Sequence, residues 1–448
     1  MIFMSRIFTS KDLRKLIIPL VFEQALAITV GMADTMMVSS VGEAAISGVS
    51  LVDMINNLIF AVLAALSTGG AVVVSQYIGA RREKDACRCA WQLLYTTLSI
   101  SLLISLAVIL CRRPMLRLFF GSIEDDVMAD AIIYLMISAF SFPFLAVYNA
   151  CAALFRSMGN SAVTLKVSII INLINIAGNA VCIFVLKMGV AGVALPSLIS
   201  RAAGAIILFV LLGDDALTVH LQHGRENPNF MIIRRILRIG VPSGIENGIF
   251  QLGRVLVVSI ISGFGTTQIA ANGVANNLDS LGVIIGQAMN LAMITVIGRC
   301  VGANDEKQIR YYTWHLIRVT YISTAIINTV VLLNLPRILA IYGLSEETMQ
   351  LAAKLVWIHD GCAMLLWPLA FVLPNMLRAC NDVSFTMIVS IVSMFTFRIG
   401  FSYLLGVLAG MGAVGVWIAM IIDWLFRIAL FMARYFSGKW KRLCLAET

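Results

Sequence analysis

Residues 18–51 read IPLVFEQALAITVGMADTMMVSSVGEAAISGVSL, and residues 241–274 read VPSGIENGIFQLGRVLVVSIISGFGTTQIAANGV. The second stretch lies 223 positions after the first and repeats its proline, its glutamate and its glycine at the same spacing. Further matches follow at the same offset, and then at an offset of 222. The matched pairs are Pro19/Pro242, Glu23/Glu246, Gly42/Gly265, Gly79/Gly302, Glu83/Glu306, Trp91/Trp314, Pro114/Pro336, Glu124/Glu346, Arg156/Arg378, Thr164/Thr386 and Ser168/Ser390. The chain is therefore an internal duplication.

The composition is that of a membrane protein. Of the 448 residues, 60% are hydrophobic and 13% are charged, and the mean hydropathy is +0.92, whereas soluble domains are about a quarter charged. These values exclude a soluble enzyme, a disordered chain and a disulfide scaffold. Twelve long apolar stretches predict twelve membrane-spanning helices in an all-α polytopic fold. They cover residues 16–38, 46–76, 90–111, 131–155, 163–186, 191–212, 239–261, 268–298, 312–334, 351–377, 385–407 and 411–433.

The basic residues gather in the gaps between these stretches, so the net charge of +9 indicates membrane orientation rather than nucleic-acid binding. With a cytoplasmic N-terminus, 21 Lys and Arg residues fall on the cytoplasmic side and six on the opposite side. This asymmetry predicts that both termini are cytoplasmic. The nine cysteines are spread singly, without the spacing of a metal site or a disulfide framework.

One longer linker, residues 213–238, separates the two copies of the repeat. We predict an N-terminal six-helix bundle over residues 1–212, a C-terminal six-helix bundle over residues 239–434, and a cytoplasmic tail over residues 435–448. Six spans return the chain to its starting side, so both halves have the same orientation. We expect a pseudo-twofold axis along the membrane normal to relate the bundles, with substrate bound between them.

Four phrases carry a family resemblance: residues 18–51 quoted above, QYIGARREKDA (76–86), FGTTQIAANGVANNLDSL (264–281) and CVGANDEKQIR (300–310). Together with twelve spans and the duplication, they make the chain resemble the multidrug and toxic compound extrusion (MATE) transporters over essentially its whole length. The resemblance implies a V-shaped pair of bundles. It also implies a cation-coupled antiporter that exchanges organic compounds for a coupling ion and needs no other cofactor.

Carboxylates inside spans are expensive and are therefore functional candidates. Asp34 lies fifteen residues after Pro19, about 22 Å along the first helix. Asn175 and Asn179 in the fifth span and Ser197 in the sixth lie at a similar predicted depth. We expect these side chains to converge with Asp34 in the N-terminal bundle, where carboxylate, amide and hydroxyl oxygens suit Na⁺ or a proton.

In the MATE resemblance, Asp34 and Asn175 match the cation-binding Asp and Asn of the N-terminal lobe, and Ser197 matches a position that is often Thr. Asn179 departs from relatives that carry a second Asp there, which puts a two-carboxylate proton relay in doubt. Asn172 continues the polar stripe of the fifth span, but helix packing explains it better.

Glu23 and Glu246 each follow a proline, Pro19 or Pro242, by about one turn. Proline bends a helix, so each glutamate is either a proton-linked gate at a hinge or a structural group at the interface. Gln251 falls near an acidic position in the seventh span of the NorM-type branch of the family. The acidic side chain that this branch carries in its C-terminal lobe is therefore absent here.

The remaining charges inside the C-terminal spans are expected to pair with one another, because isolated charges in lipid are disfavoured. The candidate partners of Arg254, Arg398 and Arg427 are Asp279, Asp360 and Asp423. Asp423 and Arg427 are spaced as an i, i+4 pair, and Asp279 and Asp360 are candidates for lining the cleft. Asn56 is the repeat partner of Asp279.

The sequence contains no nucleotide-hydrolysis or nucleophile motif, so we do not expect an enzyme. We favour an antiporter in a prokaryotic inner membrane that exports amphipathic, often cationic compounds in exchange for Na⁺ or H⁺. One chain supplies both halves of the cleft, so a monomer suffices. The rival function is a flippase for lipid-linked oligosaccharide or lipid, although such cavities usually need several basic residues to hold pyrophosphate. A passive channel leaves the buried carboxylate unexplained.

Overall fold

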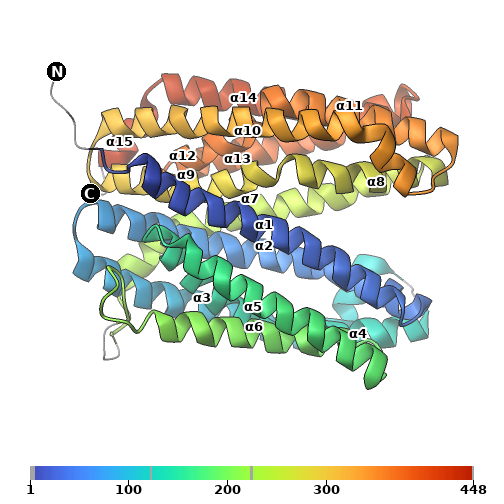
Figure 1. Cartoon of the computed structure of the whole chain (residues 1–448), viewed down its shortest axis with the longest axis horizontal. Helices are drawn as coiled ribbons and strands as arrows, with labels where there is room; N and C mark the ends of the chain where they lie inside the picture. Colours follow the sequence, from blue (N-terminus) through green and yellow to red (C-terminus); the bar gives the residue numbers. More distant parts are fainter. Residues whose placement is uncertain (1–5, 122–123, 222–225, 446–448) are drawn as a thin grey trace. The chain divides into compact units, whose positions relative to one another are not determined.

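The computed structural model describes residues 6–121, 124–221 and 226–445, and all regular elements in these ranges are helical (Figure 1). The α-helices are α1 (Ser10–Ser39), α2 (Glu43–Gly79), α3 (Glu83–Phe120), α4 (Asp125–Ser157), α5 (Ser161–Ala180), α6 (Ala191–Leu211), α7 (Phe230–Ser262), α8 (Thr266–Gly282), α9 (Ile284–Gly302), α10 (Glu306–Ile341), α11 (Glu346–Trp367), α12 (Leu373–Ala379), α13 (Val383–Ser393), α14 (Gly412–Phe436) and α15 (Lys439–Leu445). Four segments are π-helical: η1 (Val181–Val185), η2 (Pro368–Val372), η3 (Met394–Gly400) and η4 (Ser402–Leu408).

Twelve helical stretches among the described residues are long and apolar enough to cross a membrane. The predicted all-α polytopic membrane fold is therefore confirmed. Most helices extend beyond the predicted apolar stretches; α3, for example, covers Glu83–Phe120 rather than residues 90–111. Apolarity marks the part of a helix that lipid surrounds, whereas backbone hydrogen bonding continues into the polar ends.

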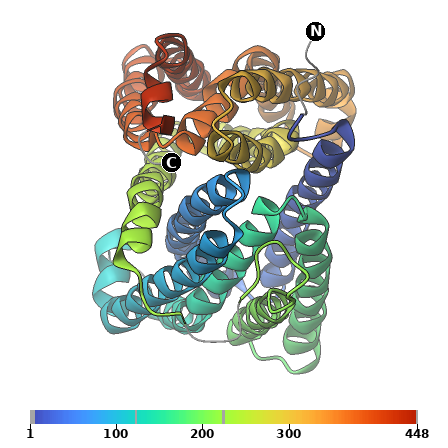
Figure 2. The same ribbon diagram turned by 90° about the vertical axis from the view of Figure 1, so that its left-hand side faces the viewer.

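The chain forms two compact units, each described here by itself. The N-terminal unit is Ser10–Gly244, and the C-terminal unit comprises the described parts of Ile245–Thr448 and Met1–Thr9. Figure 2, turned by 90°, shows that the helices of each unit run alongside one another.

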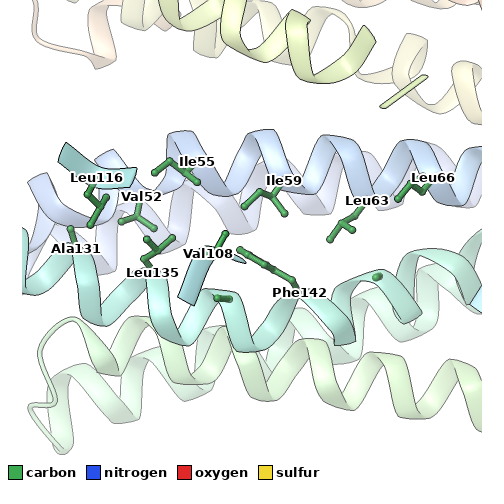
Figure 3. Packing of buried hydrophobic residues seen from close by; sticks show 12 residues of the cluster. Val52, Ile55, Ile59, Leu63, Leu66, Val108, Leu116, Ala131, Leu135 and Phe142 are labelled. Carbon is green, nitrogen blue, oxygen red and sulfur yellow. The ribbon is translucent and has the colours of Figure 1, made fainter. Parts of the chain in front are cut away.

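The N-terminal unit has an apolar core made by α2, α3 and α4 (Figure 3). Phe142 of α4 is completely buried in it and meets Phe60 of α2 edge to face, with ring centroids 6.1 Å apart. The residues that α2 contributes recur every three or four positions, as one face of a helix requires. They are Val52, Ile55, Ile59, Leu63 and Leu66.

The beginning of α7 corrects the predicted linker. Residues 230–238, expected to be part of the connection, form the first turns of α7. Arg235 donates a hydrogen bond to Gln76 Oε1 of α2 over 2.7 Å. A side-chain carbon at Gly69 would lie 2.7 Å from the Gly240 nitrogen, so glycine permits close packing of α2 against α7. These contacts extend the compact N-terminal unit to Gly244.

The predicted eighth span, residues 268–298, is also corrected, because it consists of two helices. Helix α8 ends at Gly282 and α9 begins at Ile284, with Val283 at φ −102° and ψ 4° between them. Gly282 and Gly286 flank this break, and glycine is a weak helix former. Gly286 leaves space for the Trp367 ring, which any larger residue would displace.

Candidate functional site

The predicted N-terminal cluster comes together in the structure. Asn179 Nδ2 donates a hydrogen bond to Asp34 Oδ1 over 2.8 Å, and the same nitrogen lies 3.4 Å from Asn175 Oδ1. Asn175 Nδ2 in turn donates to Ser197 Oγ over 2.9 Å. Four side chains from α1, α5 and α6 therefore form one continuous polar chain.

Helix geometry explains this convergence. Asn175 and Asn179 are four residues apart and project from one face of α5. Gly178 brings α5 and α6 together, because a side-chain carbon there would lie 2.7 Å from Pro196 Cβ. The two helices run side by side (Figure 1). Ser197 follows that proline directly, so this packing places its hydroxyl beside Asn175.

The cluster offers oxygens to a small cation. Asp34 and Ser197 are half-buried, whereas Asn175 and Asn179 are buried. Within the described ranges, Asn179 Oδ1 has no hydrogen-bond partner. A carboxylate, two amide oxygens and a hydroxyl are ligands that hard cations prefer.

Asn172 lies outside this cluster. It is half-buried and donates a hydrogen bond to Ser168 Oγ over 3.3 Å, on its own helix. The polar stripe of α5 therefore divides into a group at Asp34 and a local helix contact.

A second polar group in the N-terminal unit surrounds Asp53. Tyr134 donates a hydrogen bond to Asp53 Oδ1 over 3.1 Å, and Asn56 donates to the same oxygen over 3.4 Å. Asn56 also donates to Ser138 Oγ over 3.2 Å. These contacts join α2, which carries Asp53 and Asn56, to α4, which carries Tyr134 and Ser138.

Arg201 is a residue whose role sequence reasoning missed. It donates a hydrogen bond to Ser141 Oγ over 2.6 Å, and its guanidinium lies 4.5 Å from the centre of the Phe60 ring. The positive charge of Arg201 attracts the Asp34 carboxylate, whereas the negative charge of Asp53 repels it. The available signal was an unpaired arginine in a predicted span, one turn after Ser197.

Glu23 and Glu246 both form buried ion pairs. Arg156 lies 3.3 Å from Glu23 Oε1, and Thr164 Oγ1 donates to Glu23 Oε2 over 2.9 Å. Arg378 lies 2.7 Å from Glu246 Oε1, which also accepts a hydrogen bond from Ser390. Of the two roles left open, this geometry favours the structural one. Both α1 and α7 continue as helices through Pro19 and Pro242.

Gln251 and Arg254, both proposed for the cleft, form no ion pair among the described residues. Gln251 is half-buried, and Arg254 is exposed. Arg254 therefore does not pair with Asp279 or Asp360, although it acts on Asp279 electrostatically.

The other C-terminal charges are paired. Arg427 Nε lies 3.1 Å from Asp423 Oδ1, as the i, i+4 spacing predicted, and Arg398 lies 3.8 Å from the second oxygen of Asp423. Asp279 and Asp360, which the sequence left without a secure partner, meet His359 at 3.0 Å and 2.9 Å. The adjacent His359 and Asp360 were a signal in the sequence for a charged group on α11. The sequence did not predict that α8, which carries Asp279, packs against this group.

The MatE family model matches residues 19–181 and 242–404, one segment in each half of the chain. In sequence, the chain is 27% identical to "Uncharacterized transporter YisQ" of Bacillus subtilis, over 94% of this chain and 93% of that protein. It is 26% identical to "Probable multidrug resistance protein NorM" of Thermotoga maritima, over 96% of this chain and 93% of that protein.

In fold, the chain is similar to a solved structure described as "Outward-facing conformation of a multidrug resistance MATE family transporter of the MOP superfamily". The TM-score is 0.88 at 19% identity, and the match covers 98% of this chain and 97% of the other. Because the MatE match covers most of the chain, in both halves, this protein belongs to the MatE family of multidrug and toxic compound extrusion membrane transporters.

Proposed function

We propose that this transporter is a cation-coupled antiporter that exports amphipathic, often cationic organic compounds while Na⁺ or H⁺ enters through the Asp34 cluster. The observation that carries the proposal is the contact of Asp34 with Asn179, which continues through Asn175 to Ser197. Family membership supports transport of small molecules, and the half-buried carboxylate supplies a place for the coupling ion.

The mechanism follows from competition for the Asp34 carboxylate. In the described state, an amide N–H of Asn179 occupies one carboxylate oxygen. An entering cation takes that position and neutralises the charge, so the contact between α1 and α5 changes. A cation that binds one arrangement of these helices better shifts the population between outward-open and inward-open states. Exchange results when the organic substrate favours the opposite step.

The test is efflux of a fluorescent organic cation from proteoliposomes under separately imposed Na⁺ and pH gradients. We expect Asp34→Asn to lower gradient-driven efflux at least tenfold, to the level of protein-free vesicles, because its side chain carries no negative charge. The gradient that drives efflux by the native protein identifies the ion.

The matched control is Asp126→Asn, which removes an exposed carboxylate at the start of α4 in the same unit. It should transport like the native protein. Equal efflux by Asp34→Asn and the native protein would contradict the proposal, provided that both elute as the same species in size-exclusion chromatography. If neither gradient drives efflux by the native protein, the Asp34 mechanism fails for that substrate, and lipid-linked cargo should be tested next.

The proposal includes orientation and assembly. We propose a prokaryotic inner membrane, since the curated relatives named above are bacterial, and the excess of Lys and Arg in alternate gaps supports both termini in the cytoplasm. One chain contains both units, so a monomer is sufficient for the transport cycle.

A further inference from the structure

Three ionisable side chains meet in the C-terminal unit, outside the Asp34 cluster. His359 Nδ1 lies 3.0 Å from Asp279 Oδ1 and 2.9 Å from Asp360 Oδ1. Each residue presents one ligand atom, and these three atoms lie within 4.8 Å of one another. The cluster joins α8, which carries Asp279, to α11, which carries the other two.

The cluster is buried and incompletely bonded. Asp360 is 0% exposed, and its Oδ2 has no hydrogen-bond partner among the described residues. Asn328 of α10 is also 0% exposed, and over the same ranges neither its amide oxygen nor its amide nitrogen has a partner. An unpaired amide in a protein interior costs about 1–3 kcal/mol, so this one requires an explanation.

Gly282 shows that the Asn328 amide points into the cluster. A side-chain carbon at position 282 would collide with Asn328 Oδ1 and would lie 3.2 Å from Asp360 Oδ1. The two oxygens therefore lie over the same glycine, at the end of α8. Only glycine leaves the space that both of them occupy.

The charges of the cluster favour a cation. Two carboxylates face one imidazole, so the three side chains carry a net negative charge even when His359 is protonated. The positive charges of Arg254 in α7 and Arg398 in η3 also attract Asp279. However, Arg398 pairs with Asp423 at 3.8 Å, and Arg254 is exposed. Neither arginine forms an ion pair with Asp279 within the described part of the chain.

The surroundings restrict the ligand to a single ion. The indole rings of Trp417 and Trp424 meet the His359 ring edge to face, with ring centroids 5.8 Å and 5.1 Å away. Both tryptophans are buried, as are the three ionisable residues. An organic molecule would have to displace these rings, whereas an ion needs only the space between the ligand atoms.

We propose that Asp279, His359 and Asp360 bind one divalent transition-metal ion, such as Co²⁺, Zn²⁺ or Mn²⁺, with Asn328 Oδ1 as a fourth ligand. An imidazole nitrogen together with carboxylate oxygens suits these ions, whereas Mg²⁺ and Ca²⁺ take oxygen ligands. The metal replaces the proton that His359 Nδ1 shares with the two carboxylates. This site is separate from the Asp34 cluster, so it does not depend on the proposed antiport. The bound ion joins α8, α10 and α11 beside the break between α8 and α9.

The test is cobalt binding by the purified full-length protein in detergent, after removal of the affinity tag and treatment with a chelator. Equilibrium dialysis against Co²⁺ should leave one equivalent more on the native protein than on Asp279→Asn/Asp360→Asn. A visible absorption band of protein-bound Co²⁺ should accompany it and should disappear when Zn²⁺ is added in excess. The thermal midpoint of the native protein should rise with Co²⁺, since an ion that binds only the folded state stabilises it.

Asp34→Asn is the control for binding at the other cluster, and it should retain the full equivalent of Co²⁺. His359→Gln is a second test variant in case the double variant does not fold, and it should lose the absorption band. The proposal is overturned if the native protein retains no Co²⁺ at millimolar concentration. It is equally overturned if Asp34→Asn loses the ion or if the folded double variant retains it.

Discussion

The two units place different chemistry on the same pair of helices. In the N-terminal unit, Asn56 of α2 meets Ser138 of α4 at 3.2 Å, and both side chains are neutral. In the C-terminal unit, Asp279, the repeat partner of Asn56, meets His359 of α11 at 3.0 Å. At this repeated position the N-terminal unit therefore carries a neutral amide, and the C-terminal unit carries a carboxylate that meets His359.

The first and fifth spans show the reverse division. Asp34 and Asn175 of the N-terminal unit correspond, at offsets of 223 and 222, to Val257 and Phe397. The polar cluster of one copy is thus replaced by apolar side chains in the other. The C-terminal unit therefore does not repeat the Asp34 cluster, although Asp53 of α2 and Asp279 of α8 place a carboxylate on equivalent helices of both units.

The Glu–Arg pairs are the part that both units share. Glu23 with Arg156 and Glu246 with Arg378 lie at equivalent positions, and each pair is buried. Retention in both copies indicates a requirement of the framework, since the polar residues of the Asp34 cluster are not repeated in the C-terminal unit.

Removal of either arginine should have the largest effect on stability. Arg378→Ala leaves Glu246 buried without its cation, and Arg156→Ala does the same to Glu23; such losses cost about 3–5 kcal/mol. We expect both variants to lower the thermal unfolding midpoint of the purified protein. A variant that unfolds like the native protein but transports abnormally would assign its glutamate to gating, and the two pairs would no longer be equivalent.

Val257→Asp tests the asymmetry between the first spans. Val257 is 9% exposed, and a carboxylate within a span costs roughly 2.5–3.5 kcal/mol. We expect the variant to accumulate poorly in membranes and to unfold at lower temperature, whereas Val257→Asn should be affected less. A stable variant with altered ion coupling would show that the C-terminal unit can also accommodate a coupling carboxylate at this position.

Gly282→Ala tests the close contact that distinguishes α8 from α2. The added carbon collides with Asn328 Oδ1, so we expect a loss of about 1–3 kcal/mol in thermal or denaturant unfolding. Gly273→Ala in the same helix is the control, because a carbon there would meet nothing within 4 Å. Alanine should be neutral or stabilising at position 273. Equal behaviour of the two variants would contradict the packing described for Gly282.

The smallest expected effect is on the half-saturating concentration of the coupling ion, which should differ between substitutions of two asparagines of α5. Asn179→Ala removes the hydrogen bond to Asp34, worth about 1 kcal/mol, which corresponds to roughly a fivefold change in the half-saturating concentration of the coupling ion. Asn172→Ala removes a contact with Ser168 only, and its half-saturating concentration should change less than twofold. Efflux measured against ion concentration gives both values, and equal shifts would remove the distinction between the two parts of the stripe.

The sequence predicted the helices better than their ends. Twelve apolar stretches correspond to the membrane-spanning helices, because lipid requires long runs of apolar residues. The break at Val283 and the four π-helical segments were not predicted. Beside the break, Gly286 leaves space for the ring of Trp367, a neighbour that lies far away in sequence. Hydrophobic periodicity carries no information about such neighbours.

The candidate sites divide in the same way. Asp34, Asn175, Asn179 and Ser197 were predictable as a group, because an isolated polar side chain in a span needs a partner and helical spacing gives its depth. Arg201 was visible as a charge, but its contacts with Ser141 and Phe60 depend on how α6 packs.

The sequence by itself determined the duplication, the twelve spans, the family and the four side chains of the N-terminal cluster. The tertiary structure decided which buried charges meet: Arg156 with Glu23, Arg378 with Glu246, and His359 with both Asp279 and Asp360. The physical reason is that periodicity within one helix specifies the depth and face of a side chain. The partner opposite that face is specified only when helices pack, and here close contacts at glycines such as Gly178 and Gly282 determine that packing.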